Sequence, residues 1–188
     1  MEKPSSYCEF VGQLEKSNVH RIYHDTQYGF PIDSDNELFG RLVLEINQAG
    51  LSLTTILNKQ KNFRNAYSDF NIEQIANYNE QDISRLLSDS GIIRNKLKVN
   101  AAIFNARKIL EIQKEHRSFK EWLDKNQLLN LEAWIKLFRK TFKFTGGEIT
   151  KEFLVSSGYI KGAHIDSCTT FNLVINQSPR WYKIESKQ

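Results

Sequence analysis

The sequence has no apolar run that approaches the ~20 residues needed to cross a bilayer. Its first residues, Met1-Glu-Lys-Pro-Ser-Ser, lack the apolar centre of a secretory signal peptide. With three prolines and nine glycines in 188 residues, no proline- or glycine-rich linker divides the chain. These absences predict a cytoplasmic protein with no membrane partner, folded as a single domain over residues 1–188.

The sequence also lacks the sustained alternation of apolar and polar residues that marks β-strands. Apolar residues recur at helical spacing instead, so the predicted fold class is all-α. The segment at 8–31 is expected to be irregular and aromatic, and the tail after Phe171 to be surface structure or a frayed end. The expected helices cover residues 34–50, 52–67, 72–78, 79–87, 95–112, 118–125, 130–142 and 147–157.

Charge and cysteine content say little about function. The net charge of +4 permits nucleic-acid binding without demonstrating it. The only two cysteines, Cys8 and Cys168, lie near opposite ends of the sequence. A disulfide is not expected in a cytosolic chain, which leaves metal ligation or simple burial. Lys59, Lys61 and Arg64 are expected to form an ordinary solvated helix face.

Glu45 lies in the most apolar of the expected helices. Its neighbours leave little polar surface around it: Leu42, Val43, Leu44, Ile46 and Ala49. An ionised carboxylate is costly to bury without partners, so such a group is usually paired or functional. The structural alternative is that Glu45 caps a neighbouring helix or pairs with a lysine.

A second candidate feature is the turn Asp89-Ser-Gly91-Ile-Ile-Arg94-Asn-Lys96 between two expected helices. A glycine turn near a helix N-terminus can hold a phosphate, because exposed N–H groups and the helix dipole favour an anion. Arg94, Lys96 and Lys98 would add positive charge. The alternative is that Gly91 is only a helix C-cap.

Several motifs resemble those of the DNA-3-methyladenine glycosylase I family. Tyr23-His24-Asp25-Thr-Gln-Tyr28-Gly29-Phe-Pro31 resembles YHDxEWGxP, and Glu45-Ile-Asn-Gln48-Ala49-Gly50-Leu51-Ser52 resembles LExxQAGLS. The similarity continues at residues 90–96, at 142–146 and at His164-x-x-x-Cys168, and covers residues 8–170. It implies a helix–hairpin–helix DNA glycosylase fold, with the hairpin at about 80–112. It also implies an enzyme that flips N3-methyladenine out of alkylated double-stranded DNA and removes it hydrolytically, with no lyase step.

The resemblance further implies a zinc site made of Cys8, His24, His164 and Cys168. Taken without the family, the favoured interpretation is that these are unrelated buried side chains, because the two halves lie far apart in sequence. Four protein ligands leave no position for water, so the Zn²⁺ is expected to be structural. It would join segments 8–24 and 164–168, with His164 and Cys168 on one helical turn.

By the same resemblance, Glu45 is the catalytic carboxylate, and Tyr23, Phe10 and Leu53 bind the flipped base. Gly91, Arg94 and Lys96 are the expected DNA-binding residues. The predicted partner is duplex DNA that contains alkylated adenine, and nothing in the sequence demands an oligomer, so a monomer is expected.

The sequence departs from the family motifs at Leu53, at Gln27-Tyr28 and at His20, and Ile93 stands where the common hairpin has a second glycine. Leu53 stands where the family has a stacking tryptophan, Tyr28 where it has another tryptophan, and His20 where it has an aromatic residue. Stacking of a base on an aromatic ring contributes ~1–3 kcal/mol, so Leu53 weakens the predicted pocket. This leaves open a glycosylase for a different lesion or a non-catalytic binder of damaged DNA. A Cys₂His₂ redox sensor is a third alternative, supported only by the ligand set.

Overall fold

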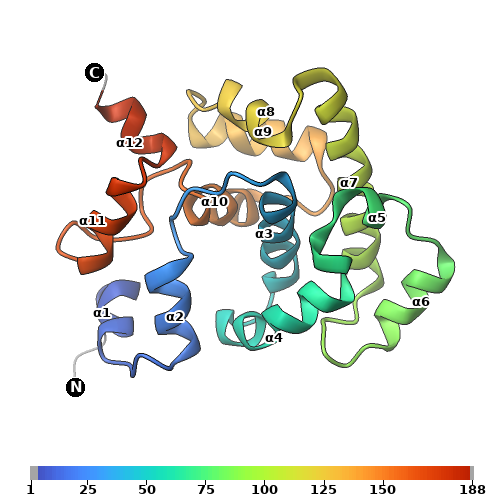
Figure 1. Ribbon diagram of the computed structural model, residues 1–188, viewed down its shortest axis with the longest axis horizontal. Coiled ribbons are helices and arrows are strands. Elements are labelled where there is room, and N and C mark those ends of the chain that lie inside the picture. Colours follow the sequence, from blue (N-terminus) through green and yellow to red (C-terminus); the bar gives the residue numbers. More distant parts are fainter. Residues whose placement is uncertain (1–3, 187–188) are drawn as a thin grey trace. The chain divides into compact units, whose positions relative to one another are not determined.

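A computed structural model describes residues 4–186 of the chain, and it contains helices but no strand over that range (Figure 1). The predicted all-α fold class is therefore confirmed for those residues. The chain divides into two compact units. The central unit comprises Asp33–Phe153, and the terminal unit comprises Met1–Ile32 together with Leu154–Gln188, so the boundary falls within one helix. The prediction of a single domain stays a prediction.

The helices of the central unit lie close to the expected ranges. They are α3 (Asp35–Gln48), α4 (Leu53–Ala66), the 3₁₀ turn η1 (Ser68–Phe70), α5 (Ile72–Ala76), α6 (Glu80–Ser88), α7 (Lys96–His116), α8 (Phe119–Lys125), α9 (Leu131–Thr141) and most of α10 (Gly147–Ser156). None of the helices within residues 4–186 is both long and apolar enough to span a membrane.

Side-chain caps explain why these helices begin where they do. Ser34 accepts a hydrogen bond from Glu37 N, as the expected capping pattern requires. Asn79 and Asp82 form a complete capping box at the start of α6. Asn95 Oδ1 accepts from the main-chain N–H groups of Leu97 and Lys98 at the start of α7. Each cap satisfies N–H groups that have no partner inside the helix.

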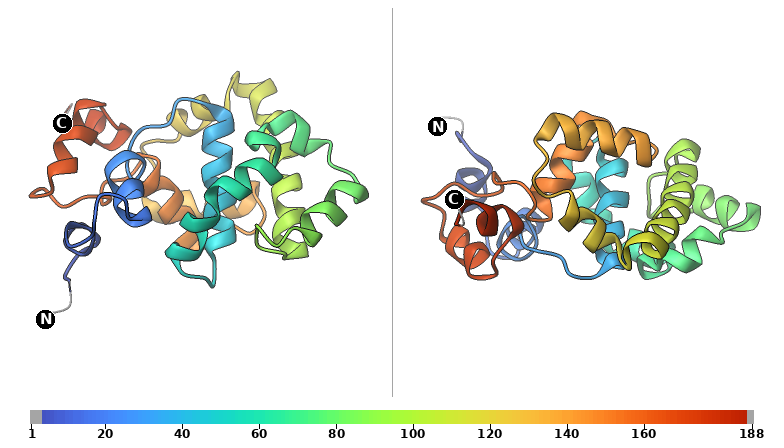
Figure 2. Two further views of the ribbon diagram at one scale, coloured as in Figure 1. Left: turned by 60° about the horizontal axis from the view of Figure 1, so that its bottom comes forward. Right: turned by 90° about the horizontal axis from the view of Figure 1, so that it is seen from above.

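Helix α3 forms the centre of the central unit. It contacts α4, α5, α7 and α8, while α5 packs along α7 (Figure 2). Phe39, Leu42, Val43 and Ile46 of α3 are at most 1% exposed. A group of aromatic rings completes the core towards α8–α10: Phe119, Trp122, Trp134, Phe138, Phe142 and Phe153. The core is thus dense in large apolar side chains and fixes α3 on several sides.

The N-terminal end of α3 is also held by a polar contact. The two carboxylate oxygens of Asp35 accept hydrogen bonds from Phe119 N at 2.7 Å and Lys120 N at 2.9 Å, the first main-chain amides of α8. A carboxylate at a helix N-terminus satisfies free N–H groups and interacts favourably with the helix dipole. Asp35 therefore joins the start of α3 to the start of α8.

The terminal unit is more helical than predicted. Residues 8–31 contain α1 (Tyr7–Gly12) and α2 (Val19–Thr26), so the expectation of an irregular segment was wrong. Ser6 and Asn18 supply the N-caps of these two helices. Both helices are too short for apolar periodicity to reveal them, and their caps were the available signal.

The tail after Phe171 also differs from the expectation. It continues α11 (Thr169–Asn176) and then forms α12 (Arg180–Glu185). Trp181 is 9% exposed, and its ring lies 6.1 Å from that of Phe171. Main-chain hydrogen bonds connect the two parts of this unit, since Gly29 N donates to Ser156 O at 3.0 Å. The tail is therefore part of the terminal unit and not a frayed end.

Candidate functional site

Glu45 lies in the last turns of α3, in the central unit, and is 8% exposed. This confirms the prediction that its carboxylate is close to the core. Three of its neighbours, Leu42, Val43 and Ile46, are at most 1% exposed. The apolar surroundings strengthen any electrostatic interaction that this carboxylate makes, because water screens it poorly.

The chain turns sharply directly after α3. Gly50 has a φ of +81°, which a residue with a Cβ rarely adopts, and the side chain of Leu51 is 42% exposed. Ser52 then caps α4 by accepting from Thr55 N at 3.2 Å. Leu53, the first residue of α4, is half-buried. Glu45 and Leu53 therefore lie on two successive helices, α3 and α4, which this turn connects.

The predicted phosphate-binding turn joins α6 to α7 and is held by side chains of α4. Lys59 Nζ donates to Ser90 O at 2.8 Å, and Asn62 Nδ2 donates to Gly91 O at 3.4 Å. The expectation that Lys59 is merely solvated was wrong. The main-chain N–H of Gly91 is occupied, because it donates to Asp89 Oδ1 at 2.7 Å.

Gly91 is not the C-cap of α6, so that alternative was wrong. The helix ends at Ser88, and Asp89 is its C-cap. Glycine avoids crowding at this position, since a Cβ at position 91 would lie 2.9 Å from Asp89 Oδ1 and 3.1 Å from Asn62 Nδ2 and would displace these side chains. It lets the turn approach α4 closely.

The residues after Gly91 offer the features that an anion needs. Within residues 4–186, the main-chain N–H groups of Ile93 and Arg94 donate to no other group of the protein. The side chains of Arg94 and Lys96 are exposed beside them. Lys98 was expected to add to this charge, but that expectation was wrong. Its side chain is 6% exposed, and its ammonium group contacts the end of α3 instead.

In the terminal unit, the side chains of Cys8, His24, His164 and Cys168 meet, with one potential ligand atom of each within 4.8 Å of all the others. His24 Nε2 lies 3.1 Å from His164 Nδ1 and 3.3 Å from Cys8 Sγ. Cys168 Sγ lies 3.7 Å from His24 Nε2 and 3.8 Å from His164 Nδ1. Tetrahedral zinc with two nitrogen and two sulfur ligands has edges of about 3.3–3.8 Å, so these four residues could hold such a metal.

The remaining ring nitrogens of the two histidines also fit metal ligation. His24 Nδ1 lies 2.7 Å from Asp25 Oδ1, and His164 Nε2 lies 2.7 Å from Tyr28 O. Asp25 is fixed in turn by Arg21 Nε at 2.7 Å. Metal-ligating histidines usually donate their other N–H to a carboxylate or a carbonyl in this way. Asp25 and Tyr28 were not predicted, although Asp25 directly follows His24 in the sequence.

His164 and Cys168 are not on one helical turn as expected. Residues 161–168 form an irregular loop, and Cys168 is the N-cap residue of α11 with an extended backbone. The loop closes through a hydrogen bond from Cys168 N to Ile165 O at 2.9 Å. His164 and Cys168 are therefore brought together by a turn and not by a helix.

The predicted base-binding residues are divided between the units. Tyr23 is 6% exposed on α2 and Phe10 is 39% exposed on α1, both in the terminal unit. They belong to an aromatic group in which the Phe10 and His20 rings lie 5.5 Å apart, as do the Tyr23 and Tyr28 rings. Glu45 and Leu53 belong to the central unit. Their assignment to one base pocket stays a prediction.

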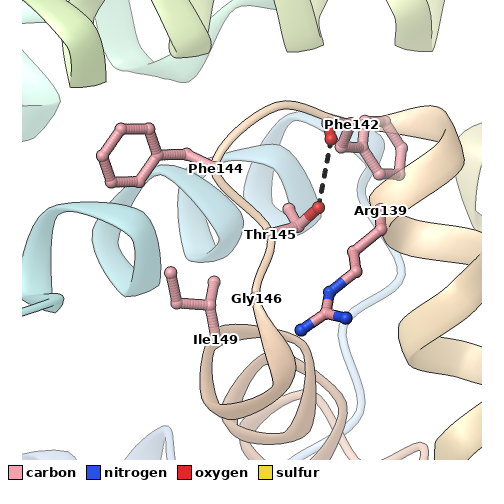
Figure 3. A pocket seen from close by; sticks show the side chains of 6 residues that line it. All are labelled: Arg139, Phe142, Phe144, Thr145, Gly146 and Ile149. Carbon is pink, nitrogen blue, oxygen red and sulfur yellow. Dashed lines mark hydrogen bonds between the residues drawn. The ribbon is translucent and has the colours of Figure 1, made fainter.

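The motif at 142–146 forms the turn between α9 and α10 and lines an open pocket of about 480 Å³ in the central unit (Figure 3). Asn105 fixes this turn by accepting from Lys143 N at 2.8 Å and donating to Lys143 O at 3.1 Å. In Figure 3 the Arg139 side chain extends towards Gly146, while Phe144 points to the other side of the turn. None of the predicted site residues lines this pocket.

Comparison with known proteins decides the family. The methyladenine glycosylase family model matches residues 13–134. The chain is 30% identical over 182 residues to DNA-3-methyladenine glycosylase 1 of Escherichia coli (strain K12), which covers 87% of this chain and 97% of that protein. The chain belongs to the methyladenine glycosylase family. The family resemblance read from the motifs is therefore confirmed.

Solved structures of methyladenine glycosylases have the same fold. A 3-methyladenine DNA glycosylase I from Staphylococcus aureus superposes with a TM-score of 0.75 at 28% identity, covering 83% of this chain and 93% of that one. A variant 3-methyladenine DNA glycosylase I in complex with 3-methyladenine also gives a TM-score of 0.75 at 28% identity, covering 83% and 94%.

Proposed function

We propose that this chain is a DNA glycosylase that removes 3-methyladenine from alkylated double-stranded DNA by hydrolysis of the N-glycosidic bond. The observation that carries the proposal is Glu45, a buried carboxylate at the position of the family's LExxQAGLS motif. Membership of the methyladenine glycosylase family supports it, as does a relative in complex with 3-methyladenine.

In this proposal Glu45 acts by electrostatic stabilisation. A base methylated at N3 carries positive charge and is already a good leaving group, so strong protonation is not required. A carboxylate that accepts hydrogen bonds from the flipped base holds that charge and favours the oxocarbenium-like sugar of the transition state. The low exposure of Glu45, 8%, makes this interaction stronger than it would be in water.

Tyr23 and Phe10 supply the aromatic contacts to the base. An aromatic face attracts a cationic base through its quadrupole as well as by stacking. Leu53 contributes apolar contact but no π face. We therefore expect weaker binding of the cationic purine than a tryptophan at position 53 would give.

The α6–turn–α7 segment is proposed to be the helix–hairpin–helix that anchors the DNA backbone. The N–H groups of Ile93 and Arg94, which have no partner in the described part of the protein, would bind a phosphate at the start of α7. Gly91 permits the turn, while Arg94 and Lys96 add charge. Binding should therefore depend strongly on salt and little on sequence.

Cys8, His24, His164 and Cys168 are proposed to hold a structural zinc ion, which would fix the two segments of the terminal unit to each other. Two observations support zinc as the metal: the set of two sulfur and two nitrogen ligands, and the contacts of the other ring nitrogen of each histidine with Asp25 and with Tyr28 O. Four protein ligands leave no position for a catalytic water. The protein is proposed to act as a monomer and a single domain.

The enzyme is proposed to lack lyase activity. Schiff-base chemistry needs a lysine whose amine is free to attack the sugar. Among the residues that the structure describes, Lys98 is the buried lysine, and it donates hydrogen bonds to two carbonyl oxygens at the end of α3. Its nitrogen is therefore not available as a nucleophile.

A non-catalytic binder of damaged DNA is the second candidate, and Leu53 is the feature that favours it. Such a protein would keep the DNA anchor and the zinc site but would bind the cationic base too weakly for excision.

Release of free 3-methyladenine from methylated duplex DNA, compared between the wild type and Glu45→Gln, tests the proposal. We expect release by the wild type and a loss of about 100-fold or more in the variant, which keeps the shape but not the charge. Equal activity would overturn the role of Glu45 alone. Binding of DNA by the wild type with no release would favour the non-catalytic binder.

A further inference from the structure

Lys98 is a buried lysine in the first turn of α7. Its side chain is 6% exposed, and its Nζ donates to Asn47 O at 3.0 Å and to Ala49 O at 2.8 Å. These two carbonyls belong to the last residues of α3, where the helix leaves carbonyl oxygens without partners. The ammonium group thus replaces the missing hydrogen bonds at that end of α3.

Burial of an ammonium group is costly unless new interactions compensate for its lost hydration. Burial lowers the pKa of the Lys98 side chain, because the charged form loses its hydration. The two carbonyls and the negative end of the α3 dipole offset that loss. Within residues 4–186 the Lys98 ammonium group pairs with no carboxylate, and its hydrogen bonds go to the C-terminal end of α3.

The contact lies between two parts of the proposed site. On one side, Lys98 follows the turn that carries Arg94 and Lys96, in the first turns of α7. On the other side, it binds the two carbonyls that follow Glu45 and precede Gly50. Asp35 holds the N-terminal end of α3. The hydrogen bonds of Lys98 therefore restrain the other end, the Asn47–Ala49 segment, against α7.

We propose that Lys98 is a positioning residue, which fixes the end of α3 against α7 so that the carboxylate of Glu45 is held in register with DNA bound at the Gly91 turn. The proposal rests on the glycosylase function proposed above. Lys98 touches neither base nor phosphate in this role, and it acts only through the main chain of residues 47–49.

The test compares Lys98→Met with wild type in single-turnover release of 3-methyladenine at saturating enzyme. Met keeps the length and apolar stem of the side chain but removes all three donors. We expect the rate at saturation to fall by about ten- to a hundredfold, because small displacements of a catalytic group are costly. Lys98→Arg, which retains a cation and its donors, should recover most of the rate.

Two further variants separate this role from stability and from DNA affinity. Ile109→Val removes one methylene from a fully buried site of the same helix, and should leave the saturated rate unchanged despite lower stability. Lys96→Met, at an exposed position, should weaken DNA binding and reduce the slope of log K against log salt by about 1. Lys98→Met should leave that slope unchanged.

Amide hydrogen exchange of residues 49–53 gives a reading that does not depend on activity. Faster exchange there in Lys98→Met, with exchange in α5 and the rest of α7 unchanged, supports the proposal. This result would hold even if the wild type released no base, an outcome that would overturn only the proposed glycosylase function. An exchange pattern equal to wild type overturns it, as does an unchanged saturated rate when the wild type releases the base. Should Lys98→Met not fold, Lys98→Gln takes its place with the same outcomes.

Discussion

The two units of this protein are built around opposite kinds of centre. The central unit is one continuous segment whose middle is apolar and rich in aromatic rings, with Phe39, Phe119 and Phe138 fully buried. The terminal unit joins two segments more than 120 residues apart, and His24 and His164 are buried at its middle beside the two cysteines. The first can be stabilised by burial of apolar surface, whereas the second is small, and the proposed metal would add a cross-link between its two segments.

The largest expected effect concerns the metal. Cys168→Ser should abolish binding of one zinc equivalent and raise hydrogen exchange in α1, α2, α11 and α12, while α3 and α7 stay protected. Zinc binding contributes about 10–16 kcal/mol in small domains that fold on the metal, more than any single core side chain. Metal analysis and exchange measured by mass spectrometry check both parts.

Ser167→Ala is the matched control, because Ser167 is exposed in the same loop and offers no ligand. It should keep the metal and the exchange pattern. Unchanged zinc content in Cys168→Ser would show that the four side chains are not a metal site.

The next effect concerns the aromatic core. Phe138→Ala should lower the free energy of unfolding of the central unit by about 3–5 kcal/mol, since it leaves a cavity among Trp122, Trp134 and Phe153. Urea denaturation followed by fluorescence measures this. The variant should still bind one zinc equivalent. Loss of the metal as well would mean that the two units unfold together, which would contradict the view that each unit is stabilised by its own centre.

The smallest effect is a stabilisation. Tyr67 is fully buried, and its hydroxyl has no hydrogen-bond partner among the described residues. Tyr67→Phe removes this unpaired group and should raise the free energy of unfolding by about 1 kcal/mol. Thermal denaturation at neutral pH checks the gain, and a loss would show that the hydroxyl is satisfied in solution.

The same residue predicts a pH dependence of the central unit. Burial raises the pKa of the Tyr67 phenol above its ordinary value, and the neighbouring Tyr78 adds to this shift. As the pH rises above about 10, the unfolded state therefore loses the proton first, and stability falls. Tyr67→Phe should reduce that alkaline loss. Equal pH profiles for the two proteins would contradict this account.

Much of the central unit could be predicted because its signals are local. Ser34 and Glu37 mark the start of α3, and Asn79 with Asp82 marks that of α6, by side chains that bond to the backbone three residues away. The apolar spacing then gave the helices themselves. The burial of Glu45 followed from its neighbours in the same way. These features depend on contacts between residues close in sequence.

Some of the errors depended on contacts distant in sequence, whereas the missed helices α1 and α2 have local caps at Ser6 and Asn18. Lys98 was expected to add charge at the Gly91 turn, because nothing near it in the sequence shows that the end of α3 offers two carbonyls 49 and 51 residues away. Gly91 was read as a possible cap, whereas Asp89 is the C-cap of α6, and the side chains of Asp89 and of Asn62 in α4 lie closest to position 91. The ligand set came from resemblance to the family, because no local pattern connects Cys8 with Cys168.

The discontinuous terminal unit has a consequence for synthesis of the chain. Cys8 and His24 leave the ribosome early, but His164 and Cys168 follow only after the whole of residues 33–153 has been translated. Domains generally begin to fold as soon as their sequence has emerged. The nascent protein therefore carries only two of the four potential ligands through most of its translation, and capture of the proposed metal would be among the last events of its maturation.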